Sequence, residues 1–228
     1  MGAAADRGVG GVGVSAGVDS VGDRLNALLA ENGQEALESI VAGRFEEYLS
    51  LFVRWNVRLN LTAIRDEEGI LSRHFVESIA CARTLPAGIQ TLLDFGSGAG
   101  FPGIPIALCR PEIAVTLAES QGKKAAFLSE GVRVLGITTK VYSGRAETID
   151  AVFDCVTLRA VDKMELAVQT AARLVRPGGW MAIMTTATDL GRLKEAAGAE
   201  FSWAEPVRIS GGGERLIALG QRAVSSPA

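Results

Sequence analysis

The spacing of hydrophobic and polar positions changes near residue 90, and the change separates two kinds of structure. Between Asp23 and about Leu85, apolar residues recur at intervals of three and four, as one face of an α-helix requires. The clearest stripe consists of Phe45, Tyr48, Leu49, Phe52 and Trp55. This spacing predicts a helical N-terminal region over residues 23–88.

From Thr91 onward, short apolar runs alternate with amphipathic segments, the order that a parallel sheet with crossover helices produces. The apolar runs predict strands over residues 91–95, 114–119, 138–142, 152–158, 179–185, 203–209 and 215–220. The segments between them predict helices near 102–109, 122–135, 162–175 and 188–198. The last two strands are expected to form an antiparallel hairpin at the sheet edge, joined across residues 210–213. We therefore expect an α/β domain over residues 89–222, with a seven-stranded, mostly parallel sheet.

The two ends of the chain lack this patterning. Seven of the first 22 residues are Gly, and such a segment offers too little side-chain area to offset the entropy of ordering it. We expect residues 1–22 to be a disordered, low-complexity tail and residues 223–228 to be a C-terminal tail. The 228 residues are 48% hydrophobic, so the rest of the chain can bury one full core.

Composition excludes several classes of protein. The three cysteines, Cys81, Cys109 and Cys155, lie in apolar segments rather than in close pairs, which argues against a disulfide framework and a zinc site. No apolar run approaches the roughly 18 residues of a membrane helix, and a signal-peptide pattern is missing from the start. We expect a soluble, cytoplasmic protein without metal or membrane contact, and we favour a monomer. The net charge of −3 provides no strong field for nucleic acid, so RNA binding would require a local basic patch.

The strongest functional signal is a glycine-rich turn after the first predicted strand. It contains Gly96, Gly98, Gly100 and Gly103, which allow the backbone to turn sharply and to approach a ligand closely. Open α/β sheets bind nucleotides at this end of their strands. The residues from Gly98 to Gly103 also satisfy the dinucleotide pattern G-x-G-x-x-G, so an NAD-binding site has to be considered as well.

Three features favour S-adenosylmethionine over NAD. The carboxylate of Asp94 at the end of the first strand would attract a cationic cofactor and repel a pyrophosphate. The carboxylate of Glu119 at the end of the second strand can accept both ribose hydroxyls of either cofactor. The sheet also leaves no second domain for a dehydrogenase substrate. The alternatives are that Asp94 caps a turn or helix and that Glu119 is an exposed strand-end acid. Ala146 and Glu147 come after the third strand, where they could reach the adenine ring or form an ordinary loop.

The segment after the fourth strand, from Asp154 to Ala160, narrows the choice of methyl acceptor. It lacks the Pro-Pro-aromatic motif of enzymes that methylate exocyclic amines, and Cys155 lies in an apolar run that favours core packing over nucleophilic attack. An acceptor that is already nucleophilic, such as guanine N7, needs positioning rather than a base, so we expect no catalytic side chain, with Arg159 as the one candidate. The only histidine, His74, is expected to be structural or to contact RNA.

A local basic patch is predicted from arginines near the helical motif. Arg54, Arg58 and Arg65 stand in a window without an acidic residue, and Arg73 precedes His74. We expect these five residues to contact RNA, because arginine holds phosphates and RNA loops expose their bases. The alternative is that they are ordinary solvated surface charges.

Several motifs together resemble a known family. They are Trp55-Asn56, the run from Asn60 to Asp66, the run from Arg73 to Ser78, and the turn that continues through Gly103-Ile104-Pro105. Over about residues 40–220 the chain resembles the ribosomal RNA small-subunit methyltransferase G family, also called glucose-inhibited division protein B. Two positions depart from the family pattern: Thr185-Thr186 replaces the usual Lys-Gly, and Glu77 stands where Asp is usual.

The resemblance implies a Rossmann-like class I S-adenosylmethionine-dependent methyltransferase of the bacterial cytoplasm. It implies transfer of a methyl group to N7 of guanine 527 in 16S rRNA, with the RNA or the small ribosomal subunit as partner. The cofactor would be bound by Asp94, Gly96, Gly98, Gly100, Phe101, Glu119, Ala146, Glu147 and Arg159, the last closing the site. Two alternatives remain: a methyltransferase acting on a small molecule or protein, and a non-catalytic dinucleotide-binding module.

Overall fold

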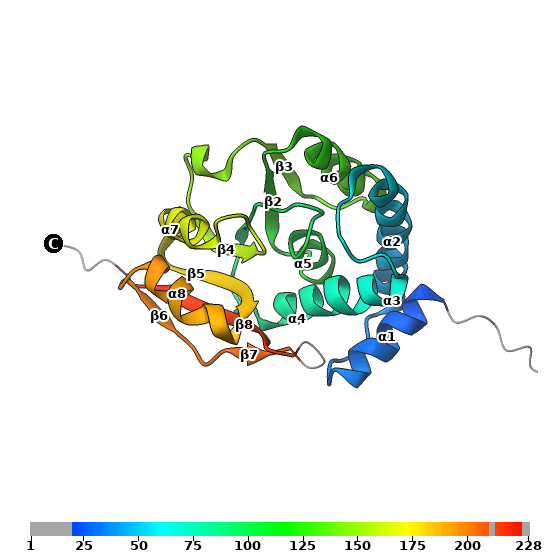
Figure 1. Ribbon diagram of the computed structural model, residues 1–228, viewed down its shortest axis with the longest axis horizontal. Helices are drawn as coiled ribbons and strands as arrows, with labels where there is room; N and C mark the ends of the chain where they lie inside the picture. The colour runs from blue at the N-terminus through cyan, green and yellow to red at the C-terminus, as the bar shows by residue number, and fades with distance from the viewer. Residues whose placement is uncertain (1–19, 210–212, 225–228) are drawn as a thin grey trace, which may run out of the picture.

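The computed structural model describes residues 20–209 and 213–224, and its centre is a single β-sheet (Figure 1). The sheet order is β3-β2-β1-β4-β5-β8-β6, with β7 paired to β8. Strands β1 to β5 pair in parallel, whereas β8 runs antiparallel to β5, β6 and β7. The strands are β1 (Thr91–Phe95), β2 (Ala114–Glu119), β3 (Lys140–Ser143), β4 (Phe153–Arg159), β5 (Val175–Thr186), β6 (Phe201–Trp203), β7 (Val207–Arg208) and β8 (Arg215–Arg222).

Helices cover both faces of the sheet, so neighbouring side chains of one strand enter different cores. In β1, Leu92 packs into the core shared with the N-terminal helices, and Leu93 packs into the core beneath α7 and α8. This alternation is the two-residue period of a strand buried on both faces. The helices that follow the strands are α5 (Gly103–Cys109), α6 (Gly122–Leu135), α7 (Met164–Leu174) and α8 (Ala187–Ala197).

The N-terminal helices pack directly on α5 and α6, as Figure 1 shows on the side where α2 and α4 are labelled. The predicted apolar stripe is buried: Phe45, Tyr48 and Phe52 are fully inaccessible to solvent and share one core with Leu92 of β1. The elements of this region are α1 (Val21–Glu31), α2 (Ser39–Leu59), α3 (Glu67–Ile70), the π-helical segment η1 (Leu71–Val76) and α4 (Glu77–Thr84).

The structure corrects the predicted elements at both ends. Helix α1 begins at Val21, inside the predicted tail, because the side chain of Ser20 accepts a hydrogen bond from the amide of Asp23, whose carboxylate accepts one from the amide of Ser20. Residues 1–19 and 225–228 lie outside the described part of the chain. The predicted strand 203–209 is divided into β6 and β7 around Pro206, which has no amide hydrogen to donate, so the sheet has eight strands rather than seven. The last strand, β8, does not lie at the edge: it lies between β5 on one side and β6 and β7 on the other.

An aromatic cluster joins the N-terminal helices to the glycine-rich turn. The rings of Tyr48 and Phe75 stack with centroids 5.3 Å apart, and the ring of Phe101, from the turn, lies 4.8 Å from that of His74. Burial, reinforced by the positive charge of Arg159, lowers the pKa of His74 to about 3. This imidazole is therefore neutral at physiological pH.

The low pKa of His74 predicts a pH dependence of stability. The unfolded chain takes up a proton near pH 6.5 that the folded protein accepts only near pH 3, so stability should fall as the pH is lowered through this interval. His74 is the only histidine, so its ring-proton NMR signal can be followed without ambiguity. The signal should not titrate between pH 8 and pH 5.5 in the folded protein, and should titrate near pH 6.5 in urea as a control. A midpoint near 6.5 in the folded protein would contradict the buried placement.

Candidate functional site

The glycine-rich turn is held from beneath by the carboxylate of Asp94. This side chain is 1% exposed, and it accepts hydrogen bonds from the amide of Gly103 at 3.2 Å and from the hydroxyl of Thr157 at 2.9 Å. A Cβ atom on Gly103 would lie 2.6 Å from the Asp94 carboxylate and 2.3 Å from the side chain of Leu117, so this position has room only for glycine. The carboxylate therefore connects β1, the start of α5 and β4.

The expectation that Asp94 faces a cationic cofactor is not met. Its carboxylate lies inside the protein and caps the turn, which is the alternative considered from the sequence. Burial raises the pKa of Asp94 to about 6, although the hydrogen bond from Thr157 opposes the rise. The Asp94 carboxylate does not face the pocket, so its charge cannot be used, as in the sequence analysis, to favour a sulfonium cofactor over a pyrophosphate.

A cavity of about 500 Å³ opens above the turn, at the carboxyl ends of β1 and β2. Its wall contains five of the residues predicted to bind the cofactor. They are Gly96, Gly98, Glu119, Ala146 and Glu147. The third strand ends beside this cavity, and the short helical turn η2 (Ala146–Thr148) carries the last two of these residues. We call this cavity the glycine-turn pocket.

Glu119 is fixed in the wall of the glycine-turn pocket. It is 6% exposed, and its two carboxylate oxygens accept hydrogen bonds from the amides of Gly98, at 2.9 Å, and Gln121, at 2.7 Å. A carboxylate has about four acceptor positions, so two remain for hydroxyl groups of a ligand. The exposed strand-end alternative is wrong, because the side chain is buried and aligned with the turn.

Gly100 and Phe101 were predicted to bind the cofactor, but they face the N-terminal helices. A Cβ atom on Gly100 would lie 2.7 Å from the hydroxyl of Tyr48, and Phe101 is 8% exposed within the aromatic cluster. The Tyr48 hydroxyl also donates to the carbonyl oxygen of Ala99 at 2.5 Å. The second half of the turn therefore anchors the pocket to α2 instead of lining it.

Arg159 lines a different cavity, of about 350 Å³, together with Arg73, Glu77 and Arg215. Its guanidinium donates to the carboxylate of Glu77 at 2.9 Å and to the carbonyl oxygen of Arg73 at 2.5 Å. The predicted contact of Arg159 with the cofactor is therefore not seen in the glycine-turn pocket. Arg215 was missed from the sequence, because it pairs with Glu77 across 138 positions of the chain.

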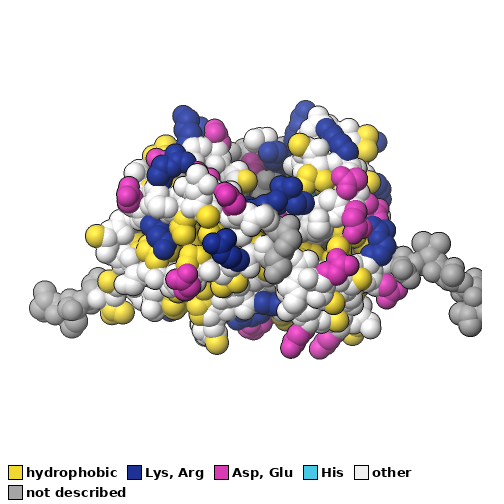
Figure 2. Space-filling model, turned by 60° about the horizontal axis from the view of Figure 1, so that its bottom comes forward, with side chains coloured by type: hydrophobic (Ala, Val, Ile, Leu, Met, Phe, Trp, Pro, Cys, Tyr) yellow, Lys and Arg dark blue, Asp and Glu magenta, His cyan; other side chains and the backbone are white. Residues whose placement is uncertain are grey.

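The residues predicted to contact RNA lie in different places. Arg54 and Arg58 line a hollow of about 500 Å³ around Trp55 on α2, whereas Arg73 is half exposed beside Glu77. Arg65 donates to the side chain of Asn60 at 3.0 Å. The face drawn in Figure 2 carries separate groups of Lys and Arg side chains among acidic ones, not one continuous basic surface.

The hydrogen-bond and stacking partners of His74 lie within the protein. The residue is half-buried, and its Nε2 atom lies 2.8 Å from the hydroxyl of Thr62, within hydrogen-bonding distance. Together with the stack on Phe101, this bond gives the ring a structural role, one of the two roles considered from the sequence. Cys155 is fully buried and burial raises the pKa of its thiol, which confirms its expected place in the core.

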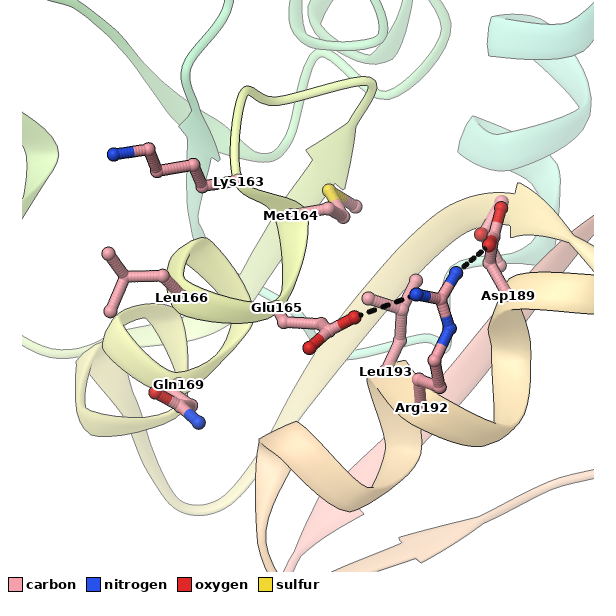
Figure 3. A pocket seen from close by; sticks show the side chains of 9 residues that line it. Lys163, Met164, Glu165, Leu166, Gln169, Asp189, Arg192 and Leu193 are labelled. Carbon is pink, nitrogen blue, oxygen red and sulfur yellow. Dashed lines mark hydrogen bonds and ion pairs between the residues drawn. The ribbon is translucent and has the colours of Figure 1, made fainter.

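A further cavity, of about 610 Å³, lies between α7 and α8 (Figure 3). Its wall includes Arg192, which extends from α8 and donates to Glu165 of α7 and to Asp189. The glycine-rich turn does not contribute to this wall. We therefore place the candidate cofactor site in the smaller glycine-turn pocket, where a strand end, backbone amides and a fixed carboxylate converge.

Two further properties of the described residues bear on function. They contain no helix with both the length and the apolar character needed to span a membrane. Within the same residues, no three His, Cys, Asp or Glu side chains are grouped as a metal site would require.

Comparison with known proteins identifies the family. Residues 42–213 match the family model described as rRNA small subunit methyltransferase G. A protein of that name from Xanthomonas campestris pv. campestris (strain B100) is 41% identical over 164 residues, which cover 70% of this chain and 76% of that protein. Another, from Neisseria meningitidis serogroup A, is 40% identical over 164 residues, covering 71% of this chain and 78% of the relative.

Solved structures with much lower identity share the fold. A methyltransferase from Pyrococcus furiosus has a TM-score of 0.59 at 13% identity, and covers 80% of this chain and 100% of its own. An O-methyltransferase from Bacillus cereus has a TM-score of 0.57 at 15% identity, and covers 77% of this chain and 91% of its own. The sheet order, the glycine turn and the matched residues agree, and the chain belongs to the rRNA small subunit methyltransferase G family, as an rRNA methyltransferase with the class I fold.

Proposed function

We propose that the protein transfers a methyl group from S-adenosylmethionine to N7 of guanine 527 in 16S rRNA. The observation that carries the proposal is Glu119, which is held beside Gly98 in the wall of the glycine-turn pocket. A buried carboxylate at the end of the second strand is the group that accepts the hydroxyls of an adenosine ribose in this kind of sheet. Family membership supports the ribosomal acceptor.

The glycine-turn pocket suits the adenosine part of the donor. Glu119 would bind the ribose, and Ala146 and Glu147 would lie beside the adenine, since all three belong to the wall of one cavity. Gly96 lets the chain pass close to this cavity: its φ is +72°, and a Cβ atom there would lie 3.1 Å from the side chain of Val161. The Bacillus cereus neighbour is described as a complex with S-adenosylhomocysteine, the demethylated product of the same donor.

The proposed reaction needs alignment more than acid-base chemistry. The donor would supply an electrophilic methyl group on a sulfonium: as N7 forms its bond to the methyl carbon, the bond from that carbon to sulfur would break, S-adenosylhomocysteine would leave as a neutral thioether, and the positive charge would end on the methylated guanine. The N7 lone pair carries no proton, so a general base has nothing to remove. The protein contributes by holding the acceptor in line with the donor, which can supply effective molarities on the order of 10⁵ M or more.

The replacement of Lys-Gly by Thr185-Thr186 has a structural counterpart. Strand β5 continues through Thr186, whose hydroxyl accepts a hydrogen bond from the amide of Asp189 at 3.3 Å and so caps α8. Thr185 lies in the wall of the cavity between α7 and α8 and also in the wall of the cavity that Arg159 lines. We propose that this chain handles its RNA without a lysine from β5, because Arg215 of β8, the sheet partner of Thr186, provides a cation at this strand end.

The direct test uses small ribosomal subunits that lack the modification. The purified protein is incubated with them and with donor labelled in the methyl group, and the modified nucleotide is then mapped. Label at N7 of guanine 527 is expected. Label on ribosomal protein, or on another base, would overturn the proposed acceptor while leaving the cofactor site intact.

Glu119→Gln should weaken cofactor binding. The substitution removes the negative charge and one of the acceptor oxygens, and a hydrogen bond to a charged group contributes roughly 1.5–3 kcal/mol. We expect the Kd of S-adenosylhomocysteine to rise by about 10-fold to 100-fold in calorimetry. Glu195→Gln on the exposed side of α8 is the matched control and should bind normally. Equal affinity of the two variants would contradict the proposed ribose site.

Arg58→Glu should weaken RNA binding without affecting the cofactor. Arg58 lines the hollow around Trp55. Reversal of one phosphate-binding charge should raise the KM for small subunits about 3-fold to 10-fold and make the affinity for them less dependent on salt concentration. Arg173→Glu, at an exposed position of α7, makes the same charge change as a control. If both variants methylate subunits like the unsubstituted protein at physiological salt, α2 is not part of the RNA surface.

A further inference from the structure

Three arginines surround one buried carboxylate in the cavity of about 350 Å³ beside the glycine-turn pocket. Glu77, which is 4% exposed at the start of α4, pairs with Arg159 of β4 at 2.9 Å, with Arg73 of η1 at 3.9 Å, and with Arg215 of β8. We call this cavity the arginine pocket. The three partners come from three separate parts of the chain, so only the folded protein forms it.

The charges of the arginine pocket do not balance. Three guanidinium groups face one carboxylate, and two of them, those of Arg159 and Arg215, are only 14% and 24% exposed. Asp189 also contributes to the wall, but its side chain is already bonded to Thr186 and Arg192 on α8. Partly buried positive charge without a counter-ion is costly, so the surplus indicates an anionic ligand.

The arginines differ in how many hydrogen-bond donors they have left. Arg159 donates to Glu77, to the hydroxyl of Ser78 and to the carbonyl oxygen of Arg73, so its guanidinium is largely committed. Arg215 has one hydrogen bond to the described residues, to Glu77, although guanidinium carries five N–H donors. Arg73 meets Glu77 only at 3.9 Å and is 52% exposed. Arg73 and Arg215 therefore retain donors for a ligand, and Arg159 holds them in place.

The location of the arginine pocket connects it with methyl transfer. It shares Ala160, just after β4, with the glycine-turn pocket, so a molecule in one cavity lies next to a molecule in the other. Its remaining wall includes Met164, Met184 and Leu216, an apolar surface suited to a flat base. The acceptor nucleotide of the proposed reaction would have to reach this place.

The chemistry of N7 decides which part of the nucleotide the arginines bind. Arginine commonly binds guanine through O6 and N7, but that contact would occupy the lone pair that must attack the methyl group. A phosphate avoids this conflict and matches the guanidinium fork. Resting on the proposed function, we infer that Arg73 and Arg215 bind a phosphate of the acceptor nucleotide, with Glu77 and Arg159 as positioning residues.

The first experiment measures ligand binding without turnover. The protein is loaded with S-adenosylhomocysteine, and its affinities for guanosine 5′-monophosphate and for guanosine are compared by NMR titration. The unsubstituted protein should bind the monophosphate about 10-fold more tightly, and Arg215→Gln should reduce this preference to less than about 2-fold. Equal affinities in the unsubstituted protein would overturn the inference.

The control is Arg192→Gln, since Arg192 lines the adjacent cavity but is paired with Glu165 and Asp189 (Figure 3). It should keep the preference for the monophosphate. Arg215→Lys keeps the positive charge and should keep part of the preference, which guards against a merely misfolded variant. Unchanged affinity for S-adenosylhomocysteine in every variant verifies that the neighbouring pocket is intact. If Arg215→Gln retains the full preference, the assignment of Arg215 is wrong.

The second experiment separates binding from chemistry. With small subunits as substrate, Arg73→Gln and Arg215→Gln should each raise KM about 10-fold and leave kcat within about 3-fold of the unsubstituted value. The slope of log affinity against log salt concentration should become shallower by about one, because one phosphate contact is lost. A fall in kcat with KM unchanged would place the arginines at the reacting base and overturn the inference. If the unsubstituted protein methylates no guanine but prefers the monophosphate, the proposed function fails while the phosphate site stands.

Discussion

The hydrogen bonds of the buried Asp94 carboxylate are the interaction on which the site depends. They run to the amide of Gly103 and to the hydroxyl of Thr157, so one side chain fixes the end of β1, the start of α5 and the middle of β4. Burial of a carboxylate is unfavourable unless such bonds compensate for the lost water. Because both ends of the turn are fixed, the amide of Gly98 stays within reach of Glu119, and the wall of the glycine-turn pocket keeps its shape.

The N-terminal helices complete this arrangement on the face of the sheet where α5 lies. Tyr48 and Phe101 hold the second half of the turn against α2, and Glu77 connects α4 with the ends of β4 and β8 through Arg159 and Arg215. The helical N-terminal region and the α/β domain therefore both contribute residues to the site. The glycine turn provides the place for the donor, and the helices provide carboxylate and guanidinium groups beside the place where an acceptor would lie.

The sequence predicts most of the sheet and the glycine-turn pocket, but not the direction of each side chain. The bounds of β1, β2 and α6 agree with the predictions, because compact apolar runs and a clear helical period determine them. Residue type and position cannot tell an inward carboxylate from an outward one, so the sequence left open whether Asp94 caps the turn or faces the cofactor. Gly100 and Phe101 were predicted to bind the cofactor, but they face the N-terminal helices. The pairing of Glu77 with Arg215 leaves no local pattern at all, since the two residues meet only through the topology of the sheet.

The most direct test of the role of Asp94 is a crystal structure of the protein with S-adenosylhomocysteine bound. We expect the Asp94 carboxylate to remain bonded to the amide of Gly103 and the hydroxyl of Thr157, with the ligand above the turn and its ribose at Glu119. A structure in which the Asp94 carboxylate leaves Gly103 to contact the amino group of the ligand would contradict this role.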